Sequence, residues 1–289
     1  KAINGKTVTG KWTRALLNKE TIDLFDSLTE HNNIYSFNDI ARVDVGIVTG
    51  ANKFFLVTDD VVAEYSLSQW AYPMFGRSEH CPGIIYDQKQ HVENKKKNNA
   101  TNFIWFKPTD KLNSGAKKYI EYGESQDLTS RYKCRIRTPW YSVPSVYSTE
   151  IGMLKRSHHC PRLIYNDLRA YTTDTAYRIT TNIVTAKKLV GCFINPLTML
   201  SAELEGRHYG GGVLELIPSE IERLIIPLPE SVSVDIVKLD TDIRNRPIDD
   251  ILKRQGDIVL SPLGVTDNDK EKLLMAWLQL CQRRQRITD

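Results

Sequence analysis

Apolar residues recur with the 3.6-residue period of an α-helix in several stretches of the chain. Residues 11–30 carry this spacing, so we expect a helical N-terminal lead-in. The strongest helical pattern covers about 268–286 and predicts a long C-terminal helix. The apolar face of this helix comprises Leu273, Leu274, Trp277, Leu278 and Cys281. Further helices are predicted over 59–71, 112–125 and 186–194.

A second helix is expected directly after residue 194. Asn195 is a favourable N-cap and Pro196 suits the first helical position, so this helix should run to about residue 204. The three glycines 210–212 end that unit, and the residues 213–217 that follow are typical of a strand.

Short β-rich runs occur between the predicted helices. Residues 43–48 and 53–57 flank the polar turn 49–52, a pattern typical of a β-hairpin. Strands are also predicted at 84–86, 103–106 and 257–260, with a polar loop over 93–99. The pattern predicts an α+β fold of mixed sheets with hairpins and flanking helices, between a helical N-terminal lead-in and a C-terminal helix.

The composition is that of an ordinary globular protein. The chain has 289 residues, of which 41% are hydrophobic and 26% charged, which excludes fibrous, disulfide-scaffold and fully disordered classes. No apolar run approaches the roughly 18–20 residues of a membrane span, so we expect no membrane association. Five scattered cysteines fit reduced thiols in a cytoplasm. Because Lys1 replaces an initiating Met and no apolar signal core follows, we expect a piece of a longer protein.

The net charge of +4 conceals an uneven distribution along the chain. Between Arg77 and Lys188 there are 20 basic and 10 acidic residues, a net charge of +10, whereas the remainder carries −6. A basic middle between acidic flanks indicates a surface that binds a polyanion such as nucleic acid. The alternative is a solvated lysine-rich surface.

The chain contains no recognisable catalytic signature. It lacks G-x-S-x-G, a P-loop, H-E-x-x-H and a glycine fingerprint after a strand, so we name no catalytic residue. The string Asn195–Thr198 superficially resembles the Asn-Pro-Pro-aromatic motif of amino-methylating enzymes, but it lacks the second proline and the aromatic residue. The helix start described above explains it.

One ten-residue segment occurs twice. Residues 77–86 (RSEHCPGIIY) match 156–165 (RSHHCPRLIY) at seven positions, which indicates either two similarly used loop-to-strand elements or chance. Each copy carries adjacent His and Cys residues that could be imagined as half of a zinc site. Because adjacent ligands rarely reach one metal and the usual Cys spacing is missing, we expect buried cysteines and no metal.

The segment 131–141 gives the clearest candidate contact with DNA. In a strand, Arg131, Lys133, Arg135 and Arg137 would share one face, where they would repel one another unless an anion compensates. Phosphate oxygens or guanine edges could do so, and so could protein carboxylates. The aromatic residues Trp140 and Tyr141 could stack on an unpaired base or belong to the core.

Other polar and basic residues are weaker candidates for the same surface. They lie in a hairpin turn, a mobile lysine loop and a helix exit. Each of these segments can be explained by an ordinary structural role as well as by DNA binding. These candidates are Thr49, Gly50, Asn52, Lys53, Arg77, Lys95, Lys96, Lys97, Arg156, Arg207, His208 and Tyr209.

Several strings together resemble the C-terminal target-recognition region of adenine-specific DNA methyltransferases from restriction–modification systems. They are VGIVTGANKFFLV at 45–57, RTPWYSVP at 137–144, and LSAELEGRHYGGGVLELIPS at 200–219 running on to IPLP at 226–229. The similarity covers about residues 11–230.

This resemblance implies a parent enzyme that transfers a methyl group from S-adenosylmethionine to adenine N6 in a specific duplex. Residues 1–34 would then be a helical connector from a missing N-terminal catalytic domain, 35–230 a DNA target-recognition domain, and 231–289 a C-terminal strand–helix extension. The implied partners are double-stranded DNA, the catalytic domain and a restriction endonuclease, in a prokaryotic cytoplasm near the nucleoid. Since the cofactor and catalytic motifs are absent, we expect no cofactor in this chain and no methyl transfer by it alone.

The resemblance also suggests that residues 207–212 and 49–53 face the flipped base or the missing domain. Two other functions stay open: a DNA-specificity subunit of a multi-subunit restriction–modification complex, and a module whose basic surface binds an acidic protein.

Overall fold

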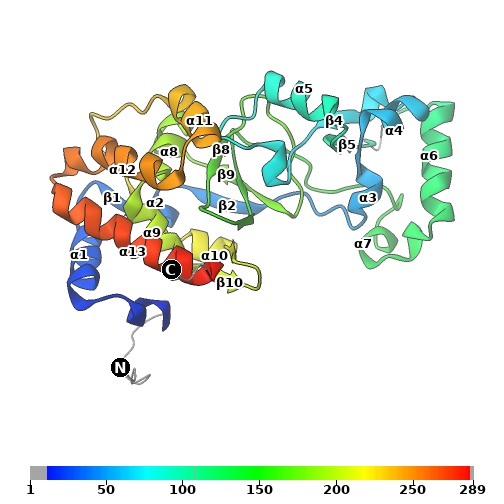
Figure 1. The fold of residues 1–289 in the computed structure, drawn as a ribbon. Coiled ribbons are helices and arrows are strands. Elements are labelled where there is room, and N and C mark those ends of the chain that lie inside the picture. The colour runs from blue at the N-terminus through cyan, green and yellow to red at the C-terminus, as the bar shows by residue number, and fades with distance from the viewer. Residues whose placement is uncertain (1–11, 108, 287–289) are drawn as a thin grey trace.

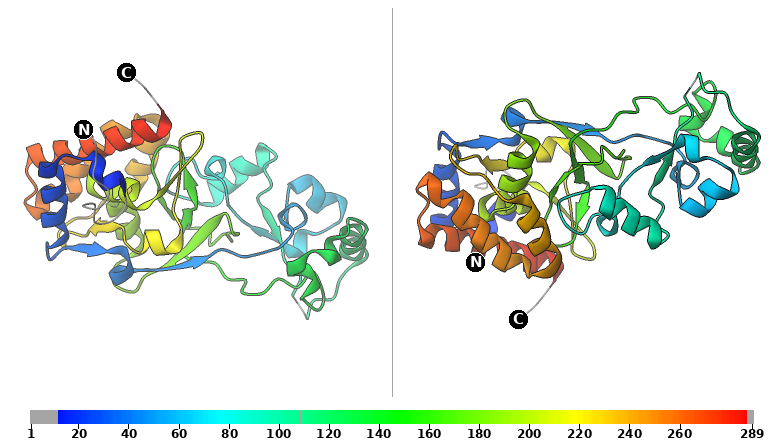
Figure 2. Two further views of the ribbon diagram at one scale, coloured as in Figure 1. Left: turned by 90° about the horizontal axis from the view of Figure 1, so that it is seen from below. Right: turned by 90° about the horizontal axis from the view of Figure 1, so that it is seen from above.

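The computed structural model describes residues 12–107 and 109–286. The chain forms an elongated α+β structure of helices and antiparallel sheets, which confirms the predicted fold class (Figures 1 and 2). The α-helices are α1 (Lys19–Thr29), α2 (Phe37–Ile40), α3 (Asn52–Phe55), α4 (Asp59–Glu64), α5 (Gln88–Lys96), α6 (Ser114–Ser125), α7 (Tyr132–Arg135), α8 (Ala186–Phe193), α9 (Pro196–Glu205), α10 (Pro218–Ile221), α11 (Ile236–Asn245), α12 (Ile248–Val259) and α13 (Asp267–Gln285).

The strands are short and lie in four sheets. They are β1 (Ile34–Ser36), β2 (Arg42–Val45), β3 (Leu56–Val57), β4 (Ala71–Pro73), β5 (Asn102–Ile104), β6 (Ile151–Leu154), β7 (Arg156–Ser157), β8 (Leu163–Tyr165), β9 (Ala176–Thr180), β10 (Arg207–Tyr209), β11 (Val213–Glu215) and β12 (Ile225–Pro227). The sheet orders are β2-β9-β6-β8, β10-β11-β7, β3-β5-β4 and β1-β12. Single 3₁₀ turns are η1 (Trp12–Leu16), η2 (Ser68–Trp70), η3 (Ser78–His80), η4 (Leu128–Ser130) and η5 (Ser261–Leu263).

Two large apolar cores divide the molecule into a body and a distal lobe. The body comprises the elements around the first core, namely α1, α2, α8–α13 and the sheets other than β3-β5-β4. The distal lobe encloses the second core, built from residues 47–143, with α3, α4, α6, α7 and β3–β5. In Figure 1 the body lies on the left and the distal lobe on the right.

Helix α9 forms the centre of the body. Its residues from Pro196 to Leu204 are buried, and the polar ones among them, Thr198, Ser201 and Glu203, have hydrogen-bond partners. Asn195 Oδ1 accepts a hydrogen bond from the backbone N–H of Thr198 at 3.0 Å, so the predicted cap is confirmed. Helices α8 and α13 likewise occur close to where periodicity placed them.

A buried ion pair fastens α13 to α9. The side chains of Arg284 and Glu203 are 0% and 1% exposed, and their closest atoms are 2.7 Å apart. The same guanidinium donates to the carbonyls of His158, His159 and Gly212. One side chain therefore connects the C-terminal helix, the central helix and two loops.

Aromatic packing builds the distal lobe. Phe54 stacks on Tyr119 with ring centroids 4.5 Å apart and lies 5.1 Å from Trp140. The Tyr119 hydroxyl donates to the Phe54 carbonyl at 2.6 Å. Rings from α3, α6 and the segment after α7 thus give this lobe a core of its own.

The predicted hairpin over 43–57 is wrong. Strand β2 pairs with β9 in the body, whereas β3 pairs with β5 in the distal lobe. The turn between the two runs is followed by helix α3, so the chain passes from one lobe to the other instead of folding back. Local β propensity was correct for parts of both runs, but tertiary pairing separated them.

Several other local predictions also differ from the structure. The polar run 93–99, predicted as a loop, lies largely in α5, because Asp87 caps that helix and Gln90 and Asn94 are buried. Residues 257–260, predicted as a strand, fall in the end of α12 and the turn that follows. The residues of α7, predicted as strand, form one helical turn. Residues 84–86 make only a single bridge to β8.

Removal of the buried cation should destabilise the body strongly. We expect Arg284→Ala to lower the free energy of unfolding by about 3–5 kcal/mol, because it leaves the Glu203 carboxylate buried without its cation. Urea titration followed by circular dichroism measures this loss. Arg283→Ala is the control: its exposed side chain lies over the Trp12 ring, a contact worth about 1 kcal/mol or less. Equal losses in the two variants would contradict this role of the ion pair.

Candidate nucleic-acid interface

The most cationic exposed turn of the distal lobe is residues 131–136, which we call the basic tip. It consists of Arg131 as N-cap and helix α7, closed by a hydrogen bond from the Arg135 N–H to the Arg131 carbonyl at 2.8 Å. Arg131, Lys133 and Arg135 are all exposed. The predicted strand with all four cations on one face is therefore wrong, because a helical turn spreads alternate residues around its axis.

The cations of the basic tip have no carboxylate partner. Within the described residues, no salt bridge of 4.0 Å or less involves Arg131, Lys133 or Arg135. The nearby carboxylates have other hydrogen bonds: Asp127 accepts from Ser130 at 2.7 Å, and Glu124 accepts from the Trp140 indole at 3.2 Å. The tip thus carries three cations that are exposed to solvent.

The fourth predicted cation has a structural role. Arg137 donates to the carbonyls of Val48 and Thr49 at 2.8 and 2.7 Å. Burial lowers the pKa of this guanidinium, although the group stays charged at neutral pH. Arg137 therefore fixes the connection between the lobes beneath the basic tip.

The turn 49–52 is the socket against which α7 packs. Gly50 has φ +80°, and a Cβ there would lie 2.6 Å from the Cβ of Lys133. Asn52 donates to Asp174 at 3.0 Å, and the Thr49 hydroxyl accepts from the backbone N–H of Ala51 at 3.1 Å. Thr49, Gly50 and Asn52 thus hold the turn, while the Lys53 side chain is exposed beside it.

The aromatic pair after the tip belongs to the core of the distal lobe. Trp140 and Tyr141 are half-buried, and they pack on Phe54 and Phe106 with ring centroids 5.1 and 5.7 Å apart. Of the two roles considered for Trp140 and Tyr141, base stacking and core packing, the structure places both residues in core packing.

A second group of predicted cations lies on α5 and η3, away from the tip. Lys95 pairs with Asp59 at 3.0 Å, and Arg77 with Glu79 at 3.3 Å. Lys96 and Lys97 are exposed at the end of α5. In Figure 1, α5 runs along the upper edge of the molecule, whereas α7 and β10 lie along the lower edge.

The third group lies on the sheet β10-β11-β7, where carboxylates neutralise it. Arg156 pairs with Glu215 at 2.6 Å and Arg207 with Glu220 at 2.9 Å. Hydrogen bonding to these carboxylates raises the pKa of both arginines. His208 lies 3.2 Å from the buried Glu203 carboxylate. Tyr209, which is half exposed, lies under the Arg156 guanidinium at 5.9 Å.

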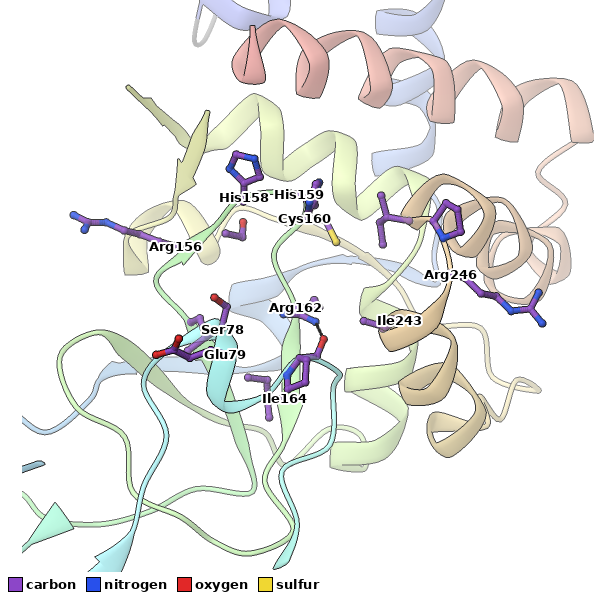
Figure 3. A pocket seen from close by; sticks show the side chains of 15 residues that line it. Ser78, Glu79, Arg156, His158, His159, Cys160, Arg162, Ile164, Ile243 and Arg246 are labelled. Atoms are coloured by element: carbon purple, nitrogen blue, oxygen red, sulfur yellow. Dashed lines mark hydrogen bonds between the residues drawn. The ribbon is translucent and has the colours of Figure 1, made fainter. Parts of the chain in front are cut away.

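The two repeat copies lie side by side. The Tyr86 N–H donates to the Tyr165 carbonyl at 2.9 Å, and the Tyr165 N–H donates to the Ile84 carbonyl at 2.7 Å. Both copies line a cavity of about 580 Å³ beside the α11–α12 junction, with side chains that include Glu79, Arg162 and Ile243 (Figure 3). The two segments thus pack against each other but differ in structure: the first contains η3 and a single bridge, whereas the second contains β7 and β8.

Of the His–Cys pairs in the repeats, His80, Cys81 and Cys160 are buried, whereas His159 is exposed. Burial raises the pKa of Cys81 to about 12 and that of Cys160 to about 11, so both thiols stay protonated. In the part of the chain that the structure describes, no three His, Cys, Asp or Glu residues are grouped to hold a metal ion. No described helix is long and apolar enough to cross a membrane.

The sequence interpretation missed Tyr132 and Ile136. In a strand these residues would share the inward face with Cys134, but in α7 only Cys134 is buried. The side chains of Tyr132 and Ile136 are 63% and 59% exposed. Their i, i+4 spacing was the available signal, since it places two residues on one side of a helical turn.

Fold and surface define a two-lobed α+β domain with an unpaired cationic tip. The family model for the C-terminal domain of Type II methyltransferase M.Eco57I matches residues 9–260. The chain belongs to this family of Type II methyltransferase C-terminal domains.

Individual relatives agree with this assignment. Type II methyltransferase M.AccI of Acinetobacter calcoaceticus is 23% identical over 252 residues, which cover 83% of this chain and 46% of that protein. The chain thus spans about half the length of this relative. A structure described as the type IIG restriction endonuclease BpuSI shares the fold, with a TM-score of 0.58 and 13% identity over 94% of this chain and 34% of that chain.

Substitution of the socket glycine should loosen the basic tip. We expect Gly50→Ala to lower the free energy of unfolding of the distal lobe by about 1–3 kcal/mol, because the new Cβ would meet Lys133 and because φ is positive. Gly210→Ala is the matched control, since a Cβ at Gly210 would meet nothing within 4 Å. Hydrogen exchange at α7 measures the effect. Unaltered exchange in Gly50→Ala would contradict the packing described.

Acidification should weaken the fold through two buried histidines. Burial lowers the pKa of His80 and of His91 from 6.5 to about 4. The unfolded chain therefore binds these protons first, so stability is full above pH 6.5 and is lost as the pH falls toward 4. We expect the urea midpoint to fall between pH 7 and 5, and the double variant His80→Gln/His91→Gln to show a weaker dependence. The exposed His158→Gln should behave as wild type.

Proposed function

We propose that this chain recognises and clamps duplex DNA for an S-adenosylmethionine-dependent adenine-N6 methyltransferase of a restriction–modification system. The observation that carries the proposal is the basic tip: three exposed cations without carboxylate partners, in a chain that belongs to a methyltransferase family. Unpaired lysine and arginine side chains bind phosphate through charge-assisted hydrogen bonds and release counterions from the duplex.

The candidate phosphate contacts can be ordered by whether each cation already has a carboxylate partner. The tip residues contact the backbone first, with the exposed Lys96 and Lys97 as a separate, weaker site. Arg156 and Arg207 would have to leave their carboxylates to bind phosphate, so they serve better as a framework for Tyr209 and the glycine turn. Discrimination between bases would come from polar side chains in the groove, each worth about 1–3 kcal/mol.

The glycine turn after β10 is the proposed approach to the catalytic domain. A Cβ added at Gly210 or Gly211 would meet nothing within 4 Å, so this part of the turn stands clear of its surroundings, while Gly212 is held by Arg284. In the proposed complex the target adenine leaves the base stack, and the turn faces that base or the domain that receives it. The socket 49–52 plays an indirect part, because it positions the tip, while the exposed Lys53 lies beside it.

The methyl donor does not fit this chain. All named strand pairs in the described residues are antiparallel, whereas nucleotide-type cofactors bind at the ends of parallel strands with helical crossovers. We therefore assign S-adenosylmethionine and the chemical step to a catalytic domain outside residues 1–289, joined through 1–34. Residues 35–230 then form the recognition domain and 231–289 its extension, in a cytoplasmic, nucleoid-associated enzyme that works with a restriction endonuclease.

Removal of the three tip cations tests this function. We expect Arg131→Ala/Lys133→Ala/Arg135→Ala to weaken duplex binding at low salt by at least 10-fold and to lower the salt slope of log K by about 3, because three phosphate contacts are lost. Fluorescence anisotropy with duplexes selected from a random pool measures both quantities. The control Lys19→Ala/Lys238→Ala/Lys253→Ala removes the same charge from the helices of the body.

The result separates the proposed function from its rivals. Equal binding by both triple variants would reject the tip as the DNA site. If the wild-type chain binds no duplex at low salt, the basic surface binds another partner, such as an acidic protein. Duplex binding combined with an upstream segment that lacks methyltransferase motifs would instead favour a DNA-specificity subunit.

A further inference from the structure

Two large apolar side chains project into solvent from the basic tip. Tyr132 is 63% exposed and Ile136 is 59% exposed. They are one helical turn apart, so they lie on the same side of the tip, opposite the buried Cys134. Single exposed apolar residues are ordinary on protein surfaces. Two neighbouring exposed apolar side chains among three cations form a more specific surface. Such a surface is complementary to a binding partner that has both apolar and anionic parts.

The tip is held in place from below. Arg137 binds the carbonyls of Val48 and Thr49, Gly50 lies against Lys133, and the Cys134 side chain is buried in the core of the distal lobe. The pair is therefore presented on a supported turn at the lower edge of the distal lobe, where Figure 1 labels α7. A side chain that must separate stacked bases needs such support.

The charges around the pair match the surroundings of a base step. Arg131 and Lys133 flank Tyr132 in the chain, and Arg135 precedes Ile136. The Lys133 ammonium lies 5.5 Å from the centroid of the Tyr132 ring, so cation and ring form one unit. In a duplex, apolar base faces lie between two anionic backbones, and proteins that kink DNA place apolar side chains between bases with cations on the adjacent phosphates.

We propose that Tyr132 and Ile136 form a wedge that enters the base stack of the bound duplex, while Arg131, Lys133 and Arg135 hold the flanking phosphates. The inference rests on the proposed function and adds a mechanism to it. The wedge fills space between bases and so stabilises a duplex from which the target adenine has rotated. Unstacking is unfavourable for an intact duplex and costs less where the stack is already interrupted. Binding should therefore favour an interrupted duplex.

The test uses the 289-residue chain and a duplex selected from a random pool. Each adenine is replaced in turn by 2-aminopurine, whose fluorescence rises when it unstacks. We expect wild-type protein to raise the signal at least 3-fold at one position, and to bind the duplex with an abasic site there about 10-fold more tightly than the intact duplex. In Tyr132→Ala/Ile136→Ala the rise should disappear and the abasic preference should fall to about 1. The salt slope should stay unchanged, since the cations remain.

Two controls separate a wedge from loss of surface or of folding. Tyr132→Phe retains the ring and should keep the fluorescence rise. Ile183→Ala removes a side chain of matched exposure, 60%, from the body and should leave both readouts unchanged. Because Tyr132 and Ile136 are exposed, their removal should not alter the unfolding midpoint.

The outcomes distinguish this inference from the proposed function. A wild-type chain that binds no duplex overturns both. A wild-type chain that binds with salt dependence, but gives no fluorescence rise or keeps the rise in Tyr132→Ala/Ile136→Ala, overturns the wedge alone. A change in oligomeric state in that variant with unchanged DNA readouts would assign the pair to an interface between copies of the chain, and would also overturn the wedge.

Discussion

One guanidinium group joins two of the segments by which the chain passes between the body and the distal lobe. Arg178, in β9, donates to the carbonyl of Val45 at 2.6 Å on the outgoing passage and to that of Ser145 at 2.8 Å on the returning one. It lies 3.6 Å from the centroid of the Tyr147 ring, whose hydroxyl donates to Asp44 at 3.1 Å. Burial lowers the pKa of this arginine, yet it stays charged and makes strong hydrogen bonds to carbonyls. This clamp holds the outgoing and returning segments beside each other, and with them the connection to the lobe that carries the basic tip.

The arginines fall into two groups that perform different tasks. Those in the interior tie backbone segments together: Arg178 connects the lobes, Arg137 holds the socket under α7, and Arg284 binds α13 to α9. Their guanidinium groups suit this work because five donors in a rigid plane satisfy several carbonyls at once. Within the residues that the structure describes, the cations of the basic tip have no such partners, and their side chains are exposed. The net charge of the middle of the chain therefore counts structural cations and exposed cations alike, and it does not tell one kind from the other.

The two repeat copies connect the middle of the chain with the C-terminal helices of the body. The two repeat copies pair through the β8 edge and surround a cavity next to α11, so a segment from the middle of the chain is joined to the C-terminal helices. Side chains on α1 and α13 also share the core of the body with β6 and β9. Helices α1 and α13 are thus packed into the body, and the distal lobe is the part that projects from it (Figure 2).

The sequence by itself determined the elements whose signals are local. Asn195 and Pro196 start α9, and the apolar periods of α8, α6 and α13 define those helices, because capping and amphipathicity act within a few residues. Only the tertiary structure decided which cations are neutralised, since Glu215 lies 59 residues from Arg156 in the chain. It also decided the form of 131–136: the alternating pattern suits a strand, but burial of Cys134 alone against the socket favours one helical turn and leaves Tyr132 and Ile136 outside. Contacts between residues far apart in the sequence decide both the neutralisation of the cations and the conformation of 131–136, so a local pattern cannot predict them.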